Sequence, residues 1–478
     1  MTQPSKFSGT KPVRQLAWGL VLFLFILTIS PFSPASELPS TVTRALKDAG
    51  IPLRSISVVV QSVDADQAII RQNAQQAMNP ASTMKLVTTY AALELLGPTY
   101  TWKTEALTDS PPVNGVLKGN LYLRGSGDPR LALEQFGLLL RQLHSRGVTD
   151  IDGDLILDRS AFSLPSHDPA AFDNEPLRPY NAGPDALLIN LKSLSLTLQA
   201  DSAQKAVAVI VETPSDDVHI DNRLLLTQEA CGDWREKIRV KVDGNGIDLS
   251  GSFAASCGDK ALNLSPWAAD VQVEQLFRAL WRELGGKLRG KVHEGLTPAT
   301  AKPLIVQESP PLAEIIRDIN KYSNNVMARQ VFLTLAAERP ATPDGARRRV
   351  KAWLAEKGLN LPELVLDNGS GLSRSERISA DGLSQLLLAA WKSPVMPELM
   401  SSLPLAGYDG TLKNRLGNGT AGGRAHLKTG YLDGVRAIAG YVLDNHDKRW
   451  VVVFLINDPR FRLGKPAMDE LLNWVAEH

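Results

Sequence analysis

Short apolar segments with the character of β-strands lie near both ends of the chain. Residues 55–63 and 67–72 are rich in β-branched side chains, and the Asp-rich segment between them is typical of a turn. Three segments near the other end also predict strands: 424–428, 437–443 and 450–456. The economical interpretation is one sheet that is built from both ends of the chain.

Helical periodicity accounts for much of the chain between these strands. Residues 82–96 predict a helix that ends at Gly97-Pro98, because glycine and proline stop helices. The spacing of apolar residues predicts four more helices: 268–284, 312–337, 344–357 and about 467–477. We therefore expect a helical cluster beside the sheet.

The segment from about residue 101 to 265 has a different character. It holds short alternating stretches with frequent Gly, Pro and Asp, for example 119–123, 151–157 and 191–198. This pattern predicts a β-rich block of two small subdomains. The fold class is thus α+β, with one discontinuous domain from residues 36–100 and 266–478 and an insertion at 101–265.

The overall composition excludes several classes of protein. Of 478 residues, 22% are charged and 44% hydrophobic, which is ordinary for a globular protein. With 52 Lys+Arg against 51 Asp+Glu, the chain lacks the basic excess that a nucleic-acid partner requires. The seven His are scattered without H-E-x-x-H spacing, and no Walker or G-x-G-x-x-G segment occurs. We expect no metal and no cofactor.

The amino terminus predicts export. Three basic residues precede an uncharged, mostly apolar run at 16–29, and small residues follow up to Ala35. This order is typical of a secretory signal peptide, here residues 1–35 with cleavage after Ala35. An uncleaved membrane anchor is the alternative, but a membrane span needs about 20 apolar residues. We expect a periplasmic protein, with loose membrane association left open.

Export also bears on the two cysteines. An oxidising compartment would join Cys231 and Cys257, the only pair available, whereas two free thiols are the alternative. Closing this loop would stabilise the protein by roughly 3 kcal/mol in the loop-entropy model. We expect a disulfide without a catalytic role.

A serine and a lysine at the start of the first predicted helix could form a nucleophile and its base. Ser82 and Lys85 are three positions apart and therefore project from the same helical face. The helix N-terminus favours negative charge on the serine oxygen. A lysine that is desolvated and flanked by cations can be neutral at pH 7 and take the serine proton.

A second group of polar residues lies on a predicted carboxy-terminal strand. Lys428 and the Thr429 hydroxyl could hold a carboxylate there, and Gly430 would let a substrate backbone approach closely. The backbone N–H of Tyr431, together with that of Ser82, could donate to an oxyanion. An ordinary strand that enters a turn is the alternative for this segment alone.

A third polar segment, Tyr322-Ser323-Asn324-Asn325, lies within the helical block. It can be divided as S-x-N (Ser323 and Asn325) or as Y-x-N (Tyr322 and Asn324). A hydroxyl there could relay a proton to a leaving nitrogen, and an amide could bind a substrate peptide group. A polar loop between helices is the alternative.

The ordered triple S-x-x-K, S-x-N, K-T-G resembles the penicillin-recognising serine enzymes, which are penicillin-binding proteins and serine β-lactamases. The segment at 367–374 and the Gly-Asp-Pro at 127–129 also resemble one subgroup. Ser82 and Ser323 are 241 positions apart, and a large insertion between them is similar to the low-molecular-mass class C penicillin-binding proteins. The resemblance covers essentially the whole chain after residue 35 and favours the S-x-N reading.

The resemblance implies a fold and an activity. The fold is a β-lactamase-like antiparallel sheet with a helical cluster and the β-rich insertion. The activity is that of a serine-type D-Ala-D-Ala carboxypeptidase and endopeptidase of peptidoglycan. Its partners would be peptidoglycan stem peptides as substrates and β-lactam antibiotics as covalent inhibitors.

The resemblance also implies roles in the reaction. Ser82 attacks the penultimate D-Ala carbonyl and becomes the acyl-enzyme, and Lys85 is the general base. Ser323 passes the proton to the departing D-Ala nitrogen. Asn325 positions Lys85 and the substrate amide.

Substrate-binding roles follow in the same way. Lys428 and Thr429 would hold the terminal carboxylate. Arg374 would help to bind the side chain of the stem peptide, and an acidic residue of the insertion would meet its ammonium group. Asp173 is the candidate, from its position shortly before Pro179-Tyr180. Tyr431 departs from the family, which more often has Ser or Thr there.

Two other functions are open. A serine β-lactamase would need a residue dedicated to activating water, and none is recognisable in the sequence. A non-catalytic envelope protein that binds peptidoglycan would have no need for all three polar motifs.

Overall fold

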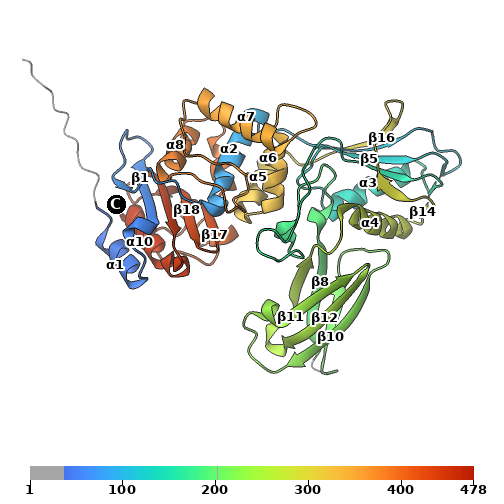
Figure 1. The fold of residues 1–478 in the computed structure, drawn as a ribbon, viewed down its shortest axis with the longest axis horizontal. Helices are drawn as coiled ribbons and strands as arrows, with labels where there is room; N and C mark the ends of the chain where they lie inside the picture. Colours follow the sequence, from blue (N-terminus) through green and yellow to red (C-terminus); the bar gives the residue numbers. More distant parts are fainter. Residues whose placement is uncertain (1–36, 202) are drawn as a thin grey trace, which may run out of the picture. The chain divides into compact units, whose positions relative to one another are not determined.

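The structure is a computed structural model that describes residues 37–201 and 203–478 (Figure 1). The predicted signal peptide, residues 1–35, lies outside the described residues. All described residues belong to one unit. Within them, no helix has the length and hydrophobicity needed to span a membrane.

One sheet joins the two ends of the chain, as the sequence predicts. It is five-stranded and antiparallel, in the order β17-β18-β19-β1-β2. Its strands are β17 Ala425–Leu432, β18 Val435–Leu443, β19 Arg449–Asn457, β1 Ile56–Ser62 and β2 Ile70–Gln72. Figure 1 shows β1 (blue) beside the carboxy-terminal strands (red).

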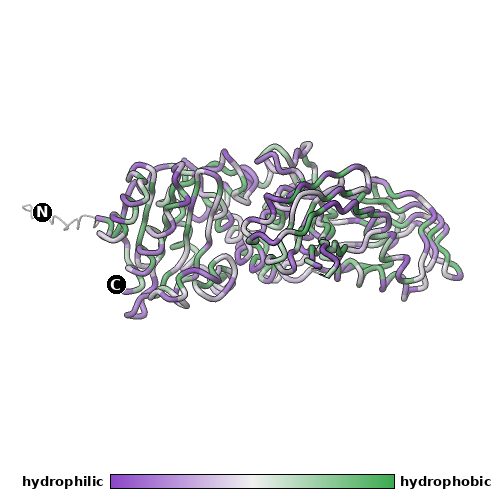
Figure 2. The backbone as a smooth tube through the Cα atoms, turned by 90° about the horizontal axis from the view of Figure 1, so that it is seen from below, coloured by the Kyte–Doolittle hydropathy of each residue, from purple (hydrophilic) through white to green (hydrophobic). Residues whose placement is uncertain are grey.

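Both faces of this sheet are covered because its strands carry apolar residues at successive positions. Val58 and Val60 pack with α1 (Ser40–Asp48) and α10 (Lys465–Glu477) on one face. Val59 packs with the helical cluster on the other face. In Figure 2, hydrophobic stretches (green) follow the strands and helices, and hydrophilic residues (purple) lie at the turns. Because both faces of the sheet are buried, its edge strand β17 is held in a fixed position.

The helical cluster carries most of the polar motifs. Its helices are α2 Lys85–Leu96, α5 Leu312–Lys321, α6 Asn325–Thr334, α7 Pro343–Glu356, α8 Ala380–Trp391 and α9 Met396–Ser402. The sequence predicts one continuous helix at 312–337. This prediction is wrong, because residues 322–324 separate α5 from α6. Ser323 has a φ of 58°, and the side chain of Asn324 caps α6 by accepting the N–H of Met327.

The first part of the inserted region combines two small sheets with helices. Their orders are β15-β7-β5-β3-β16 and β14-β6-β4, and their residues share one core with α3 and α4. The strands are β3 Lys103–Thr108, β4 Val116–Leu117, β5 Leu121–Gly125, β6 Asp150–Ile151, β7 Leu155–Asp158, β14 Lys287–Leu288, β15 Val292–Glu294 and β16 Lys302–Glu308. The helices are α3 Leu133–Ser145 and α4 Ala269–Glu283.

Two features of this part differ from the sequence expectation. Helix α3 lies inside the block that was expected to be β-rich, and it buries Phe136, Leu139, Leu140 and Leu143, which follow helical spacing. Strands β14, β15 and β16, beyond residue 265, pair with β6, β7 and β3. The boundary expected at 265 therefore separates strands that pair with one another.

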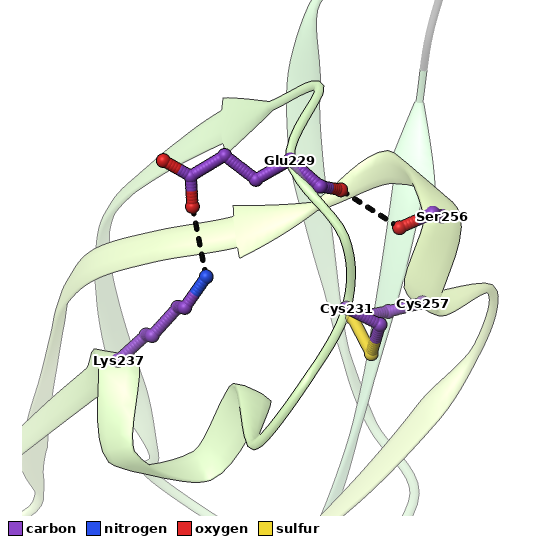
Figure 3. The surroundings of a disulfide bond; sticks show 5 residues. All are labelled: Glu229, Cys231, Lys237, Ser256 and Cys257. Atoms are coloured by element: carbon purple, nitrogen blue, oxygen red, sulfur yellow. Dashed lines mark hydrogen bonds and ion pairs between the residues drawn. A yellow bond between two sulfur atoms is a disulfide. The ribbon is translucent and has the colours of Figure 1, made fainter.

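The second part of the insertion consists of two three-stranded sheets around a common core. Their orders are β13-β8-β9 and β10-β12-β11. The strands are β8 Leu194–Asp201, β9 Ala206–Val211, β10 His219–Thr227, β11 Ile238–Asp243, β12 Gly246–Ala254 and β13 Lys260–Leu264. A disulfide joins Cys231 and Cys257 here, as predicted, and the Ser256 hydroxyl donates to the backbone carbonyl of Glu229 beside it (Figure 3).

Candidate active site

Ser82 lies in a short turn of 3₁₀-helix, η2 (Ala81–Met84), that leads directly into α2. The entry to this turn is fixed by hydrogen bonds. The N–H of Ala81 donates to Asn79 Oδ1 at 2.9 Å, and the Thr83 hydroxyl donates to the Pro80 carbonyl at 2.8 Å. Ser82 therefore lies directly before α2, and its carbonyl accepts the backbone N–H of Lys85, the first residue of that helix.

Lys85, one turn further on, is fully buried and has its side-chain nitrogen among three oxygens. Nζ lies 2.9 Å from Ser82 Oγ and donates to Asn325 Oδ1 at 2.6 Å. It also donates to the backbone carbonyl of Ser370. The amine is thus held in contact with the hydroxyl that it would have to deprotonate.

The surroundings of Lys85 favour its neutral form. Burial lowers the pKa of Lys85 well below its ordinary value, and the cation of Lys428 lowers it further. Glu376 acts in the opposite direction, and Arg329 contributes a smaller lowering. A neutral amine has two N–H donors and one lone pair. Asn325 and Ser370 can take the donors, which leaves the lone pair for the Ser82 hydroxyl.

Lys428 occupies a similar position on β17. It is fully buried, and its Nζ donates to Ser323 Oγ at 2.8 Å and to the Thr429 carbonyl at 2.9 Å. Burial lowers the pKa of Lys428 to about 7. In contrast, Tyr322 is 69% exposed and Asn324 is used as a helix cap. These placements favour the S-x-N reading of the motif.

A close backbone approach brings the edge strand to the Ser82 turn. A Cβ atom at Gly430 would lie 2.7 Å from the Pro80 carbonyl oxygen and 3.0 Å from the Ala81 Cβ. Only glycine allows this approach without a shift of the backbone. Next to it, the Thr429 hydroxyl lies 2.8 Å from the hydroxyl of Thr411, which lies in the short 3₁₀-helix η7 (Gly410–Leu412).

The candidate residues for the stem-peptide side chain lie near a large cavity. Arg374 lines this space of about 1240 Å³, donates to the Asp433 carbonyl at 3.0 Å and stacks on the Phe172 ring. Asp173 is not among the lining residues. Its carboxylate accepts from the Tyr180 hydroxyl at 2.8 Å and from the Asn181 amide at 2.7 Å. The structure thus brings Phe172, rather than Asp173, onto Arg374.

The chain matches a known family over nearly its whole length. The model of the D-Ala-D-Ala carboxypeptidase 3 (S13) family matches residues 38–477. The chain belongs to this family. The expected penicillin-recognising fold is confirmed as well, since this S13 chain superposes on a crystal structure of penicillin binding protein 4 from Haemophilus influenzae with a TM-score of 0.77. That comparison has 26% identity and covers 91% of this chain and 99% of the other.

Curated relatives agree with the S13 assignment. D-alanyl-D-alanine carboxypeptidase DacB of Haemophilus influenzae is 26% identical over 454 residues, which are 94% of each chain. A D-alanyl-D-alanine carboxypeptidase of an Actinomadura species is 28% identical over 467 residues, or 92% of this chain and 86% of the relative. A crystal structure of the Haemophilus penicillin binding protein 4 complexed with a β-lactam matches with a TM-score of 0.71 and 25% identity, covering 91% of this chain and 99% of that one.

Sequence reasoning overlooked several groups at this S13 site. The backbone carbonyl of Ser370, which accepts from Lys85, cannot be recognised in the sequence, because a residue of any type could supply it. The buried carboxylate of Glu376 follows the recognised 367–374 segment but was given no role. Asn79 also escaped notice, although its side chain donates to the Ser373 carbonyl at 2.9 Å. An acidic residue just after the glycine-containing segment 367–374 is the sequence signal that could have found Glu376.

Replacing Tyr431 by threonine should change the rate of acylation by a penicillin less than about threefold. Only the backbone N–H of residue 431 would face an oxyanion, and the Tyr431 ring is 52% exposed and packs on Phe461. Stopped-flow labelling with a fluorescent penicillin measures this rate. Gly430→Ala is the matched contrast, since its Cβ would meet the Pro80 carbonyl. A large loss in the Tyr431 variant would assign a role to its ring.

Proposed function

We propose that this S13 protein is a serine hydrolase that removes the terminal D-Ala of peptidoglycan stem peptides through an acyl-enzyme on Ser82. One observation carries the proposal: the buried Lys85 amine contacts Ser82 Oγ at 2.9 Å while Asn325 and a backbone carbonyl hold its other side. A neutral amine in hydrogen-bonding reach of a hydroxyl is the arrangement of a general base and its nucleophile.

The first half of the reaction then uses groups that are already in place. Lys85 takes the proton of Ser82 as Oγ bonds to the carbonyl carbon of the penultimate D-Ala. The N–H groups of Ser82 and Tyr431 donate to the oxyanion. Ser323 passes the proton taken up by Lys85 on to the nitrogen of the terminal D-Ala as the C–N bond breaks, which leaves Lys85 free to take a proton from water. Water then hydrolyses the ester, which releases the shortened peptide and restores the Ser82 hydroxyl.

A cluster beside the nucleophile suits the terminal carboxylate of the substrate. The Lys428 ammonium supplies the opposite charge, and the Thr429 hydroxyl is a donor on the same strand. Gly430 leaves room for the peptide backbone. This cluster predicts a preference for substrates that end in a free D-amino acid.

The stem-peptide side chain would enter the cavity at Arg374. The Arg374 guanidinium makes no ion pair with any carboxylate among the described residues and can bind an anionic group there. Asp173 remains our candidate for the ammonium partner, although its carboxylate already holds Tyr180 and Asn181. A diamino acid with its own carboxylate, such as diaminopimelate, fits this combination of charges.

Cleavage of cross-links is the second activity that we propose. A D-amino-acid cross-link is also a D-Ala amide, so Ser82 and Lys85 would act in the same way and only the leaving amine would be larger. The protein would act on the cell wall after export to the periplasm and removal of residues 1–35. β-Lactams would acylate Ser82, in keeping with the β-lactam complex of the Haemophilus protein.

Product analysis tests the proposed function. Purified protein that lacks residues 1–35 is incubated with muropeptide monomers and dimers, and the products are separated by chromatography and mass spectrometry. We expect free D-Ala from pentapeptide monomers and conversion of dimers to monomers. Intact substrates would contradict the proposal and favour a non-catalytic protein. A fluorescent penicillin that turns over faster than it accumulates on Ser82 would instead indicate a β-lactamase.

Above about pH 7 the catalytic efficiency on D-Ala-D-Ala peptides should fall, by up to about tenfold per pH unit. Lys428, whose pKa burial lowers to about 7, is an ammonium below that pH and loses its charge above it. Only the charged form attracts the terminal carboxylate. The matched substrate is the same peptide with a C-terminal amide, whose kcat/KM should lack this alkaline decline. An identical decline for both substrates would assign it to another group.

A further inference from the structure

We propose that Glu376 is a positioning residue for Lys85: it fixes the turn at residues 367–371 so that the Ser370 carbonyl meets the lysine amine. This inference rests on the proposed role of Lys85 as the base. Glu376 does not contact Ser82 or Lys85 by a hydrogen bond, and it acts through the backbone of the turn.

Three successive backbone groups converge on one oxygen of Glu376. Oε1 accepts the N–H groups of Asp367 at 3.3 Å, of Asn368 at 3.1 Å and of Gly369 at 3.0 Å. Glu376 is fully buried, and its other carboxylate oxygen has no hydrogen-bond partner. Buried backbone N–H groups need acceptors, so this carboxylate determines the path of the turn.

The turn is tied to the nucleophile helix by its carbonyl groups. The Ser370 carbonyl accepts from Lys85, and the Gly369 carbonyl accepts from the Thr88 hydroxyl at 2.6 Å. Lys85 and Thr88 lie one turn apart on α2 and thus face the same way. Holding Gly369 and Ser370 in register with this face requires a rigid turn, which the Glu376 contacts supply.

Close packing explains why this turn cannot be replaced by a looser one. Gly371 has a φ of 81°, and a Cβ there would lie 2.0 Å from the Ala81 carbonyl oxygen, next to Ser82. Gly369 has a φ of 70°, and a Cβ there would lie 2.6 Å from Phe332. The turn is therefore enclosed between η2 and α6, so a small displacement of it would also move Lys85 or Ser82.

The charges around Lys85 set the expected pH effect of a Glu376 variant. Lys428 on β17 and Arg329 on α6 lower the pKa of Lys85, whereas Glu376 raises it. Burial raises the pKa of the Glu376 carboxyl, the three N–H donors act in the opposite direction, and the charge of Asp367 adds a smaller rise. Removing the carboxylate charge therefore disfavours the Lys85 ammonium and lowers the pKa of Lys85.

Two variants separate the shape of Glu376 from its charge. Glu376→Gln keeps an oxygen for the three N–H groups, so penicillin acylation should stay within about threefold of wild type, while the acid limb of its pH profile moves to lower pH. Glu376→Leu removes the acceptor, and acylation should fall about 100-fold, as expected for a misplaced catalytic group. Glu363→Gln is the matched control, because that carboxylate accepts the N–H of Ser379 and does not touch the turn.

The measurements are the acylation rate constant between pH 5 and 9, the melting temperature, and the ¹³C NMR titration of Lys85 in lysine-labelled protein, assigned with Lys85→Met. The inference would be overturned if Glu376→Gln left both the acid limb of the acylation pH profile and the pKa of Lys85 unchanged. It would also be overturned if both Glu376 variants lost the same fraction of the acylation rate. A merely structural residue would lower only the melting temperature. Absence of a Ser82 adduct in the wild type would contradict the proposed function instead, and the NMR titration would still test Glu376. If Glu376→Leu does not fold, Glu376→Asp takes its place, because the shorter side chain withdraws the acceptor from the three N–H groups and acylation should again fall.

Discussion

Ser82→Ala should abolish the covalent penicillin adduct and all hydrolysis of D-Ala-D-Ala peptides, to below the detection limit of either assay. Among the described residues, the Ser82 hydroxyl is the one hydrogen-bond partner of the Lys85 amine that can become a nucleophile, because the other two partners are an amide oxygen and a backbone carbonyl. Without it, no ester can form. Intact-mass spectrometry after incubation with penicillin measures the adduct.

The control for this variant is Ser384→Ala. Ser384 is a buried serine on α8 whose hydroxyl donates to the Asp381 carbonyl, away from the site. It should keep wild-type acylation. Ser82→Ala should retain a wild-type melting temperature and reversible binding of the substrate carboxylate at Lys428. A covalent adduct that persists in Ser82→Ala would move the nucleophile to another residue, of which Ser323, in contact with Lys428, is the first to examine.

Local patterns in the sequence predict those parts of this protein that local forces determine. Strands of consecutive β-branched residues and the three polar motifs are of this kind, and the structure brings both Ser82 and Asn325 into contact with Lys85. The tertiary packing that places Gly430 against Pro80 is not a local property. The glycine itself, however, signals in the sequence that another backbone approaches closely there.

Parts that depend on tertiary contacts could not be predicted. The apolar spacing at 312–337 continues across the break at Ser323, whose left-handed backbone is stabilised by its contact with Lys428 and by the Asn324 cap. The Ser370 carbonyl on Lys85 depends on the main-chain path of the turn, and a main-chain group has no residue type to recognise. The sequence indicates Asp173 by its position alone, and the residues that its carboxylate contacts in the structure, Tyr180 and Asn181, lie within eight residues of it.

Lys85→Met should slow acylation of Ser82 by about 10²–10⁴-fold, the usual contribution of a general base. Methionine matches the length and burial of the lysine but cannot take a proton. Lys85→Arg is the matched variant that keeps a cation, and it should be as slow, because a guanidinium stays protonated at neutral pH. Near wild-type acylation in either variant would exclude Lys85 as the base.

The same variant should also flatten the pH dependence of stability. Burial lowers the pKa of Lys85 below its ordinary value of 10.5, so between the two pKa values the unfolded chain binds a proton that the folded chain does not. The free energy of unfolding therefore rises with pH across this window, by up to about 1.4 kcal/mol per pH unit from this one group. Lys85→Met removes that contribution, and the contribution of Lys428, between about pH 7 and 10.5, remains. Urea unfolding from pH 6 to 9 measures the slope. An unchanged slope would mean that Lys85 is an ammonium in the folded protein, and a protonated lysine could not accept the Ser82 proton.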